Sequence, residues 1–333
     1  MEEFKNFQPH YPYKEQLLGR KQILLLILCI TFFISGPGLL GFFYYRHLLH
    51  KRLQDPQYAL HIIEQTGPQK EALKTVYLAE ILGLSDDILT SFYAFDTEIA
   101  TQQLLSTPII KSAVIKKKFP DKVYIDYTVR TPIAYIYEYT NTAIDKQKKL
   151  FPILPYFTPK ILPQLYLGLS ENDLKNVNER EDSAEIWGKV LEGEKVDLAF
   201  AILEFLSLPA YSSLWNVRYI DVSKAFDKHY GQKQIVVTIE EQLIKESKEG
   251  PILYVYPRTL RLSPKNYISD IKRYLQIRNH LRNKADQEVN IEEDNEQEKG
   301  QVVIEGKTII IDLRLPQLAF MKEVDTAELG GSL

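Results

Sequence analysis

The longest uncharged stretch of the sequence lies close to its N-terminus. The 23 residues at 23–45 carry no charged side chain, so a helix over them is about 34 Å long and reaches across the hydrocarbon core of a bilayer. The 22 residues in front are many for a signal peptide, and no A-x-A-like cleavage site follows the run. We therefore expect an uncleaved transmembrane helix at 23–45, behind a cytoplasmic tail at 1–22.

Basic residues flank this run on both sides, which leaves the positive-inside comparison nearly balanced. They are Arg20 and Lys21 before the run, and Arg46, Lys51 and Arg52 after it. Charge alone therefore says little about orientation. A short tail inside the cell, with the bulk of the chain exported, is the simpler prediction.

After a short basic connector at 46–57, the pattern predicts a strand and then two helices. Residues 58–64 have strand composition and end at the turn dipeptide Gly67-Pro68. Apolar side chains then recur at spacings of three and four, which predicts an amphipathic helix. They are Leu73, Val76, Tyr77, Ile81 and Leu84. Asp96 is placed to cap a second helix through Thr107, and Pro108 ends it.

Two strands are expected next, on either side of a Phe119-Pro120-Asp121 turn. They cover 113–118 and 122–130, and apolar side chains alternate along the second, so one of its faces is buried. A further run at 133–138 completes the unit, which we place at 58–140. The order strand, helix, helix, strand, strand is the arrangement of a POTRA domain.

A second unit is expected at 141–325, followed by a tail at 326–333. Helical spacing marks 197–208, and a second helix begins near Ser263-Pro264. Residues 283–307 are rich in acidic side chains and predict a loop. Strands are expected at 217–222, 234–239, 252–256, 308–315 and 317–322. The fold class is therefore α+β, with one transmembrane helix, a POTRA-like βααββ domain and a mixed α/β sheet domain with a C-terminal edge strand.

Composition narrows the chemistry that the chain can perform. The net charge of -3 gives no field that would gather nucleic acid, and the single cysteine, Cys29, permits neither an intramolecular disulfide nor a thiolate metal cluster. The sequence contains no H-E-x-x-H, no G-x-S-x-G elbow and no P-loop lysine motif. We therefore expect no enzyme activity, no metal, no cofactor and no small-molecule substrate.

Short segments of the sequence resemble segments of the FtsQ/DivIB family of cell-division proteins. They occur in the same order as in the family, after a single transmembrane helix. In the first unit they are Leu105-Ser106-Thr107-Pro108-Ile109-Ile110-Lys111-Ser112-Ala113, Phe119-Pro120 with Val123-Tyr124-Ile125, and Arg130-Thr131-Pro132-Ile133-Ala134. In the second unit they are Ala143-Ile144-Asp145-Lys146-Gln147-Lys148, Leu150-Phe151-Pro152, Leu162-Pro163 and Ile311-Asp312-Leu313-Arg314. The resemblance covers about 58–322.

The resemblance implies a scaffold of the divisome that has no active site. It implies a single-pass protein of the bacterial inner membrane, with its folded domains outside and its place at the division septum. In the family, the POTRA unit contacts upstream division proteins, and the terminal strands dock the FtsB member of the FtsB/FtsL pair by β-augmentation. The docking residues carried over to this chain are Ile311, Leu313, Leu315, Gln317, Leu318, Ala319, Phe320, Met321 and Lys322.

Two surface features, the terminal residues and a group of lysines, have a structural interpretation as well as a functional one. The terminal residues alone would read as an ordinary edge strand, and only the resemblance favours docking. Four lysines around the predicted hairpin, Lys116, Lys117, Lys118 and Lys122, form a possible POTRA contact with an acidic partner or with anionic lipid. A solvated strand face that resists aggregation is the simpler reading of these lysines.

Two other classes of protein remain as alternatives. A POTRA-containing outer-membrane assembly or secretion factor would need a many-stranded barrel, for which the chain has no room. A membrane-anchored cell-wall-modifying enzyme would need a convergent acid, nucleophile or metal site. A row at Tyr135, Tyr137 and Tyr139 suggests either a binding groove or simple stabilisation of a sheet.

Overall fold

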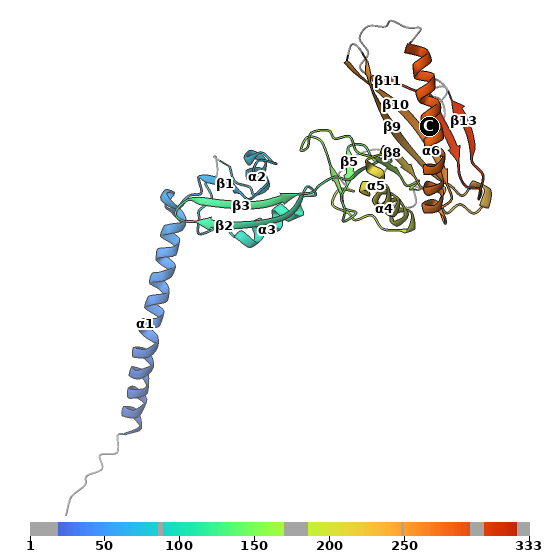
Figure 1. The fold of residues 1–333 in the computed structure, drawn as a ribbon. Helices are drawn as coiled ribbons and strands as arrows, with labels where there is room; N and C mark the ends of the chain where they lie inside the picture. The colour runs from blue at the N-terminus through green and yellow to red at the C-terminus, as the bar shows by residue number, and fades with distance from the viewer. Residues whose placement is uncertain (1–18, 86–88, 170–185, 248–249, 294–302, 325–333) are drawn as a thin grey trace, which may run out of the picture.

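The computed structural model describes residues 19–85, 89–169, 186–247, 250–293 and 303–324 (Figure 1). It begins with helix α1 (Arg20–Gln54), which contains Pro37 and is long and apolar enough to cross a membrane. None of its apolar window is buried against the rest of the chain. The helix also extends through most of the predicted 46–57 connector, so basic residues after Tyr45 lie on its last turns.

The next unit is a three-stranded sheet with two helices on one face. Its strands are β1 (Ile62–Thr66), β2 (Ile110–Lys118) and β3 (Lys122–Val129), in the order β1-β3-β2, and its helices are α2 (Thr75–Ile81) and α3 (Thr97–Ser106). Strand β1 is parallel to β3, whereas β2 and β3 form an antiparallel hairpin. This arrangement confirms the predicted βααββ domain.

Alternating apolar residues explain why the helices cover only one face of this sheet. Ile115 of β2 and Ile125 of β3 pair across the hairpin, and both are buried against Leu78 of α2 and Leu104 of α3. Asp96 caps α3 as predicted, because its Oδ1 accepts hydrogen bonds from the backbone N–H groups of Glu98 and Ile99.

Two predicted boundaries of this unit are wrong. The first strand begins at Ile62 rather than at Tyr58, because Tyr58 belongs to a short 3-10 turn, Pro56–Tyr58, and Ala59 forms an isolated bridge with Ser91 instead. The run at 133–138 does not belong to the POTRA unit. Its strand, β4 (Ala134–Ile136), pairs with β5 and β7 of the second sheet, so the last strand of the POTRA unit is β3.

The second unit is built on a long mixed sheet with the path β13-β12-β10-β9-β8-β7-β4-β5-β6, and β11 pairs with β10 off this path. The strands after β4 are β5 (Thr142–Ile144), β6 (Leu150–Pro152), β7 (Gln164–Tyr166), β8 (Trp215–Asp221), β9 (Ile235–Ser247), β10 (Gly250–Leu262), β11 (Val303–Glu305), β12 (Thr308–Asp312) and β13 (Phe320–Val324). Helices α4 (Glu194–Leu206), α5 (Pro209–Ser212) and α6 (Tyr267–Glu293) accompany it. The mixed sheet confirms the predicted α+β fold.

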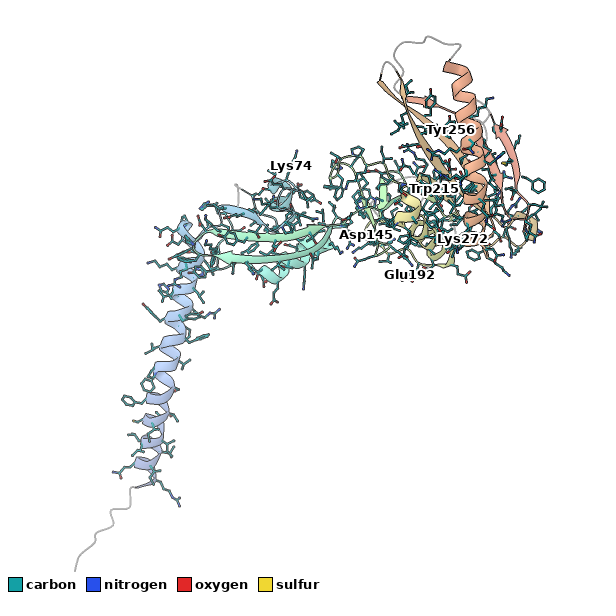
Figure 2. The ribbon with its side chains drawn as sticks, viewed as in Figure 1. Lys74, Asp145, Glu192, Trp215, Tyr256 and Lys272 are labelled. Carbon is teal, nitrogen blue, oxygen red and sulfur yellow. The ribbon has the colours of Figure 1, made fainter. Side chains whose placement is uncertain are left out.

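One face of this sheet carries the main core. Leu165, Ile220, Val237 and Leu260 come from neighbouring strands and are fully buried, and Ile202 of α4 packs into the same cluster. Trp215, at the start of β8, is also buried within it and is labelled near the middle of the domain in Figure 2. Figure 1 shows α6 lying along β9 and β10.

The prediction of an acidic loop at 283–307 is wrong over much of that range. Helix α6 continues to Glu293, and β11 begins at Val303. Adding turns to an existing helix costs far less than starting one, so a helix anchored by buried Ile271, Tyr274 and Leu281 continues into a polar sequence. The middle of the predicted loop, at 294–302, lies outside the described residues, as do the tails at 1–18 and 325–333.

Candidate partner-binding edge

Strand β13 forms one edge of the large sheet. It pairs with β12 in antiparallel register, from Thr308 opposite Val324 to Asp312 opposite Phe320. Within the described parts of the chain, no strand pairs with its other side. An edge of this kind presents main-chain donors and acceptors that a partner strand can use.

The side chains around this edge are unusually apolar for exposed positions. Phe320 is 59% exposed and Met321 is 51% exposed, and the two point to opposite faces of β13. Leu315 and Leu318, in the connection before the strand, are also exposed. A β13 surface that is open on both faces suits a partner that adds a strand and also covers apolar side chains.

The sequence-based choice of docking residues is wrong for Ile311 and Leu313. Both are fully buried in the main core. Strand β12 is paired with β10 on one side and with β13 on the other, so it also lacks an unpaired edge. Alternation along β12 predicts a buried face, but it does not reveal that both edges are occupied.

The remaining predicted residues lie in or next to β13. Gln317 has a positive φ of 66° in the turn before the strand, and Ala319 packs against the core. Lys322 is exposed and lies opposite Ile310 in the ladder. The predicted strand at 317–322 is therefore shifted, because the turn occupies its first residues and β13 extends to Val324.

An arginine and an aspartate fix the connection between β12 and β13. Arg314 Nη2 donates to Asp312 Oδ2 at 2.6 Å, and Arg314 Nη1 donates to the carbonyl of Gly231 at 3.0 Å. Burial acts to raise the pKa of Asp312, but the hydrogen bonds and positive charge of Arg314 outweigh it and lower that pKa. The sequence phrase Ile311-Asp312-Leu313-Arg314 thus alternates between core residues and this ion pair.

Helix α6 holds the same connection from the other side. Arg273 Nη1 donates to the carbonyl of Leu315 at 2.6 Å, and its Nη2 contacts Asp270 at 2.5 Å. Burial raises the pKa of Asp270 even though Arg273 and the backbone N–H of Ser263 oppose this shift. The sequence analysis missed Arg273, because a single arginine on an amphipathic helix carries no signal of its long-range partner.

The four lysines of the predicted POTRA contact do not share one environment. Lys117 Nζ donates to the carbonyls of Phe92 and Phe95, so this side chain supports its own domain. By strand alternation Lys116 and Lys118 lie on the opposite face, which the helices leave open. Lys122 lies directly opposite Lys118 and therefore shares that open face.

The predicted tyrosine row is not a single row. The Tyr137 ring contacts Tyr166 and Tyr219 at centroid distances of 5.2 Å and 5.9 Å. Tyr135 and Tyr139 pack against two different hydrophobic clusters. Because β4 ends at Ile136, strict alternation does not continue far enough to align all three rings.

Among the described residues, no group of three or more His, Cys, Asp or Glu side chains is arranged to hold a metal ion. A pocket of about 770 Å³ lies between α4 and the start of β8. Its lining includes Lys146, Glu204, Ser207 and Trp215. Neither observation assigns a reaction or a cofactor to the chain.

The geometry defines a class of protein, an apolar anchor helix followed by a POTRA domain and a domain with an open sheet edge. Comparison with family models supports this description, since residues 69–127 match the POTRA domain, FtsQ-type. No curated protein matches the sequence. This match and the apolar helix in front of the matched domain support an FtsQ/DivIB-like protein. Its architecture is compatible with a single-pass protein of the inner membrane.

Proposed function

We propose that this chain is a non-enzymatic scaffold of the division machinery. Its FtsQ-type POTRA domain suggests protein contacts in cell division. Helix α1 would cross the inner membrane once, with the N-terminus in the cytoplasm and both folded domains outside. The protein would act at the septum by bringing division proteins together and so supporting peptidoglycan synthesis by others.

The observation that carries this proposal is the exposed edge of β13. A segment of a small single-pass division protein, of the FtsB/FtsL kind, would add a strand to β13 and cover Phe320 or Met321. Main-chain hydrogen bonds would supply affinity, and the apolar side chains would supply selectivity. The POTRA domain would contact a different, upstream member of the machinery, so that both partners are held on one scaffold.

Photo-crosslinking in intact cells tests the docking edge. A photoreactive amino acid at Phe320 should capture a small single-pass division protein, identified by mass spectrometry. The matched control is Ile161, an apolar side chain of the same domain that is 82% exposed and precedes β7, several strands away from β13. Failure to capture any division protein from positions 315, 318, 320, 321 and 322 would reject this edge as the docking site.

A further inference from the structure

Four aromatic rings gather where α1 enters the POTRA domain. We call Tyr58, Phe92, Tyr93 and Phe119 the membrane-proximal ring cluster. Tyr58 contacts Tyr93 at 5.3 Å and Phe119 at 5.8 Å between ring centroids. Phe92 contacts the same two rings, at 5.6 Å and 6.1 Å. The cluster therefore ties the first residues after α1 to the tip of the β2–β3 hairpin.

Phe119 is the exposed member of this cluster. It lies at the hairpin tip with 62% of its surface exposed, although the domain core is nearby. Basic groups lie over two of the other rings. The Arg52 guanidinium lies 5.7 Å from the Tyr93 centroid, and the Lys117 ammonium lies 5.1 Å from the Phe92 centroid. Aromatic rings beside basic residues are typical of the boundary between a membrane and water.

Lysines gather on the open face of the sheet at the end next to the hairpin tip. Lys116, Lys118 and Lys122 share this face, as argued from the strand register. Three carboxylates are close to it: Glu64 opposite Tyr124 and Asp126 opposite Thr66 in the ladder, and Asp121 in the hairpin turn. The lysines and carboxylates balance in number, but the three lysines lie at the end of the face next to the hairpin tip, whereas Asp126 lies two residues beyond Tyr124 along β3. Lys51 and Arg52 at the end of α1 add positive charge on the side of the tip.

The length of α1 places this surface near the lipid headgroups. The apolar run ends at Tyr45, and the nine helical residues from Arg46 to Gln54 rise about 13 Å. The polar layer on each side of a bilayer is about 5–8 Å thick. An upright helix holds the cluster just outside this layer, and a tilt of about 20°, the average for such helices, lowers one side of the domain toward it.

We infer that the membrane-proximal ring cluster and the lysines of the open face dock onto anionic phospholipid headgroups of the membrane that α1 spans. Phe119 enters the headgroup layer, and Lys116, Lys118 and Lys122 contact lipid phosphates. The membrane then restrains the direction in which the POTRA domain points away from α1. This inference rests on the proposed membrane span, and it is independent of partner docking at β13.

Spin labelling of the full-length protein in nanodiscs tests the inference. Cys29 is first replaced by serine, and the label is attached at Phe119→Cys. The control position is Val76→Cys on α2, which is 77% exposed on the helical side of the domain. Headgroup-linked nickel should relax the label at 119 severalfold more strongly than the label at 76 when the nanodisc contains phosphatidylglycerol. Equal relaxation at the two positions would overturn the inference.

Charge reversal separates anionic lipid from a purely apolar contact. Lys116→Glu, Lys118→Glu and Lys122→Glu together should reduce relaxation at position 119, as should a neutral phosphatidylcholine nanodisc. The matched variant reverses Lys70, Lys74 and Lys160, which are exposed elsewhere, and should change nothing. Unchanged relaxation after reversal of the first three lysines would exclude anionic headgroups as the ligand. Failure of the chain to enter nanodiscs at all would instead contradict the proposed span.

Discussion

Arg130 and Asp145 form a buried ion pair between the two folded domains. Arg130 follows β3, and its Nη1 lies 2.6 Å from Asp145 Oδ2, with each side chain 6% exposed. Arg130 Nε also donates to the carbonyl of Pro108 at 3.0 Å. Asp145 in turn accepts hydrogen bonds from the backbone N–H groups of Gln147 and Lys149. Figure 2 labels Asp145 on the side of the sheet domain that faces the POTRA domain.

A second contact crosses the same junction. The ring of Tyr77, on α2, lies 5.0 Å from the ring of Tyr156 in the sheet domain. Burial, the hydrogen bond with Tyr156 and nearby negative charge raise the pKa of Tyr77 above its usual range. Together, these two contacts restrain the angle between the domains more strongly than either contact alone.

Replacing Arg130 by alanine should lower the free energy of unfolding by about 3 kcal/mol or more, because the buried Asp145 carboxyl group would lose its partner. Urea denaturation of the purified full-length protein measures this loss. The control is Arg218→Ala, which breaks a pair with Glu240 whose arginine is 42% exposed, and which should change stability by about 1 kcal/mol or less. Equal losses in the two variants would contradict the importance of the buried pair.

The Arg130→Ala variant should also loosen the angle between the domains. Labels on Val76 of α2 and Leu208, after α4, are exposed and report the distance between the domains by pulsed electron resonance, with Cys29 replaced by serine. The variant should broaden the distance distribution, whereas Arg218→Ala should not. An unchanged distribution would show that the Tyr77–Tyr156 contact is sufficient to hold the domains.

A buried network joins α6 to the long β9–β10 hairpin. The Tyr274 hydroxyl and Arg278 Nε both donate to Glu241 Oε1 at 2.8 Å. Burial, together with the negative charge of Glu241, raises the pKa of Tyr274 well above its usual range, so the hydroxyl remains a donor throughout the physiological range.

Tyr274→Phe should therefore cost about 2 kcal/mol, the magnitude of a buried hydrogen bond to a charged group. Thermal or urea unfolding measures this cost. Tyr124→Phe is the matched control, since the Tyr124 hydroxyl accepts its hydrogen bond from the exposed ammonium of Lys118. Its effect should remain within about 0.5 kcal/mol. A neutral Tyr274→Phe would mean that Arg278 alone satisfies Glu241.

The Asp312–Arg314 pair makes stability depend on pH in a defined direction. The pKa of Asp312 is lowered in the folded state, so its carboxylate contributes stability above the unfolded pKa of about 3.9. This contribution is lost as the pH falls through the folded-state pKa of Asp312. Carboxyl titration by NMR should show that Arg314→Ala raises the pKa of Asp312. Arg218→Ala, remote from this pair, should leave it unchanged. A pKa that stays low without Arg314 would contradict the assigned cause.

The same substitution should affect partner capture at Phe320 but stability at Ile311. Phe320→Glu should leave the unfolding midpoint nearly unchanged, because the side chain is exposed, but it should weaken capture of a docked partner. Ile311→Glu should cost several kcal/mol, because a carboxylate would enter a core position with no exposed surface. Circular dichroism and co-purification together measure both effects. A Phe320→Glu variant that folds and captures its partner normally would argue against docking at β13.

The sequence alone determined the features that depend on neighbouring residues. An uninterrupted apolar run predicted α1, alternation in 122–130 predicted β3 and its buried face, and Asp96 marked the start of α3. Each of these signals is local, because helix periodicity, strand alternation and capping involve residues within a few positions of one another. The short segments that resemble the FtsQ/DivIB family then indicated which domains these elements belong to.

Only the tertiary structure decided which edges and faces remain open. The sequence predicted two terminal strands, but pairing with β10 encloses β12 and leaves β13 at the edge. The tertiary structure also places β4 in the second sheet and separates Lys117 from the lysines on either side of it. Strand pairing and long-range side-chain contacts join residues far apart in the chain, and alternation fixes which face is buried without fixing the neighbouring strand.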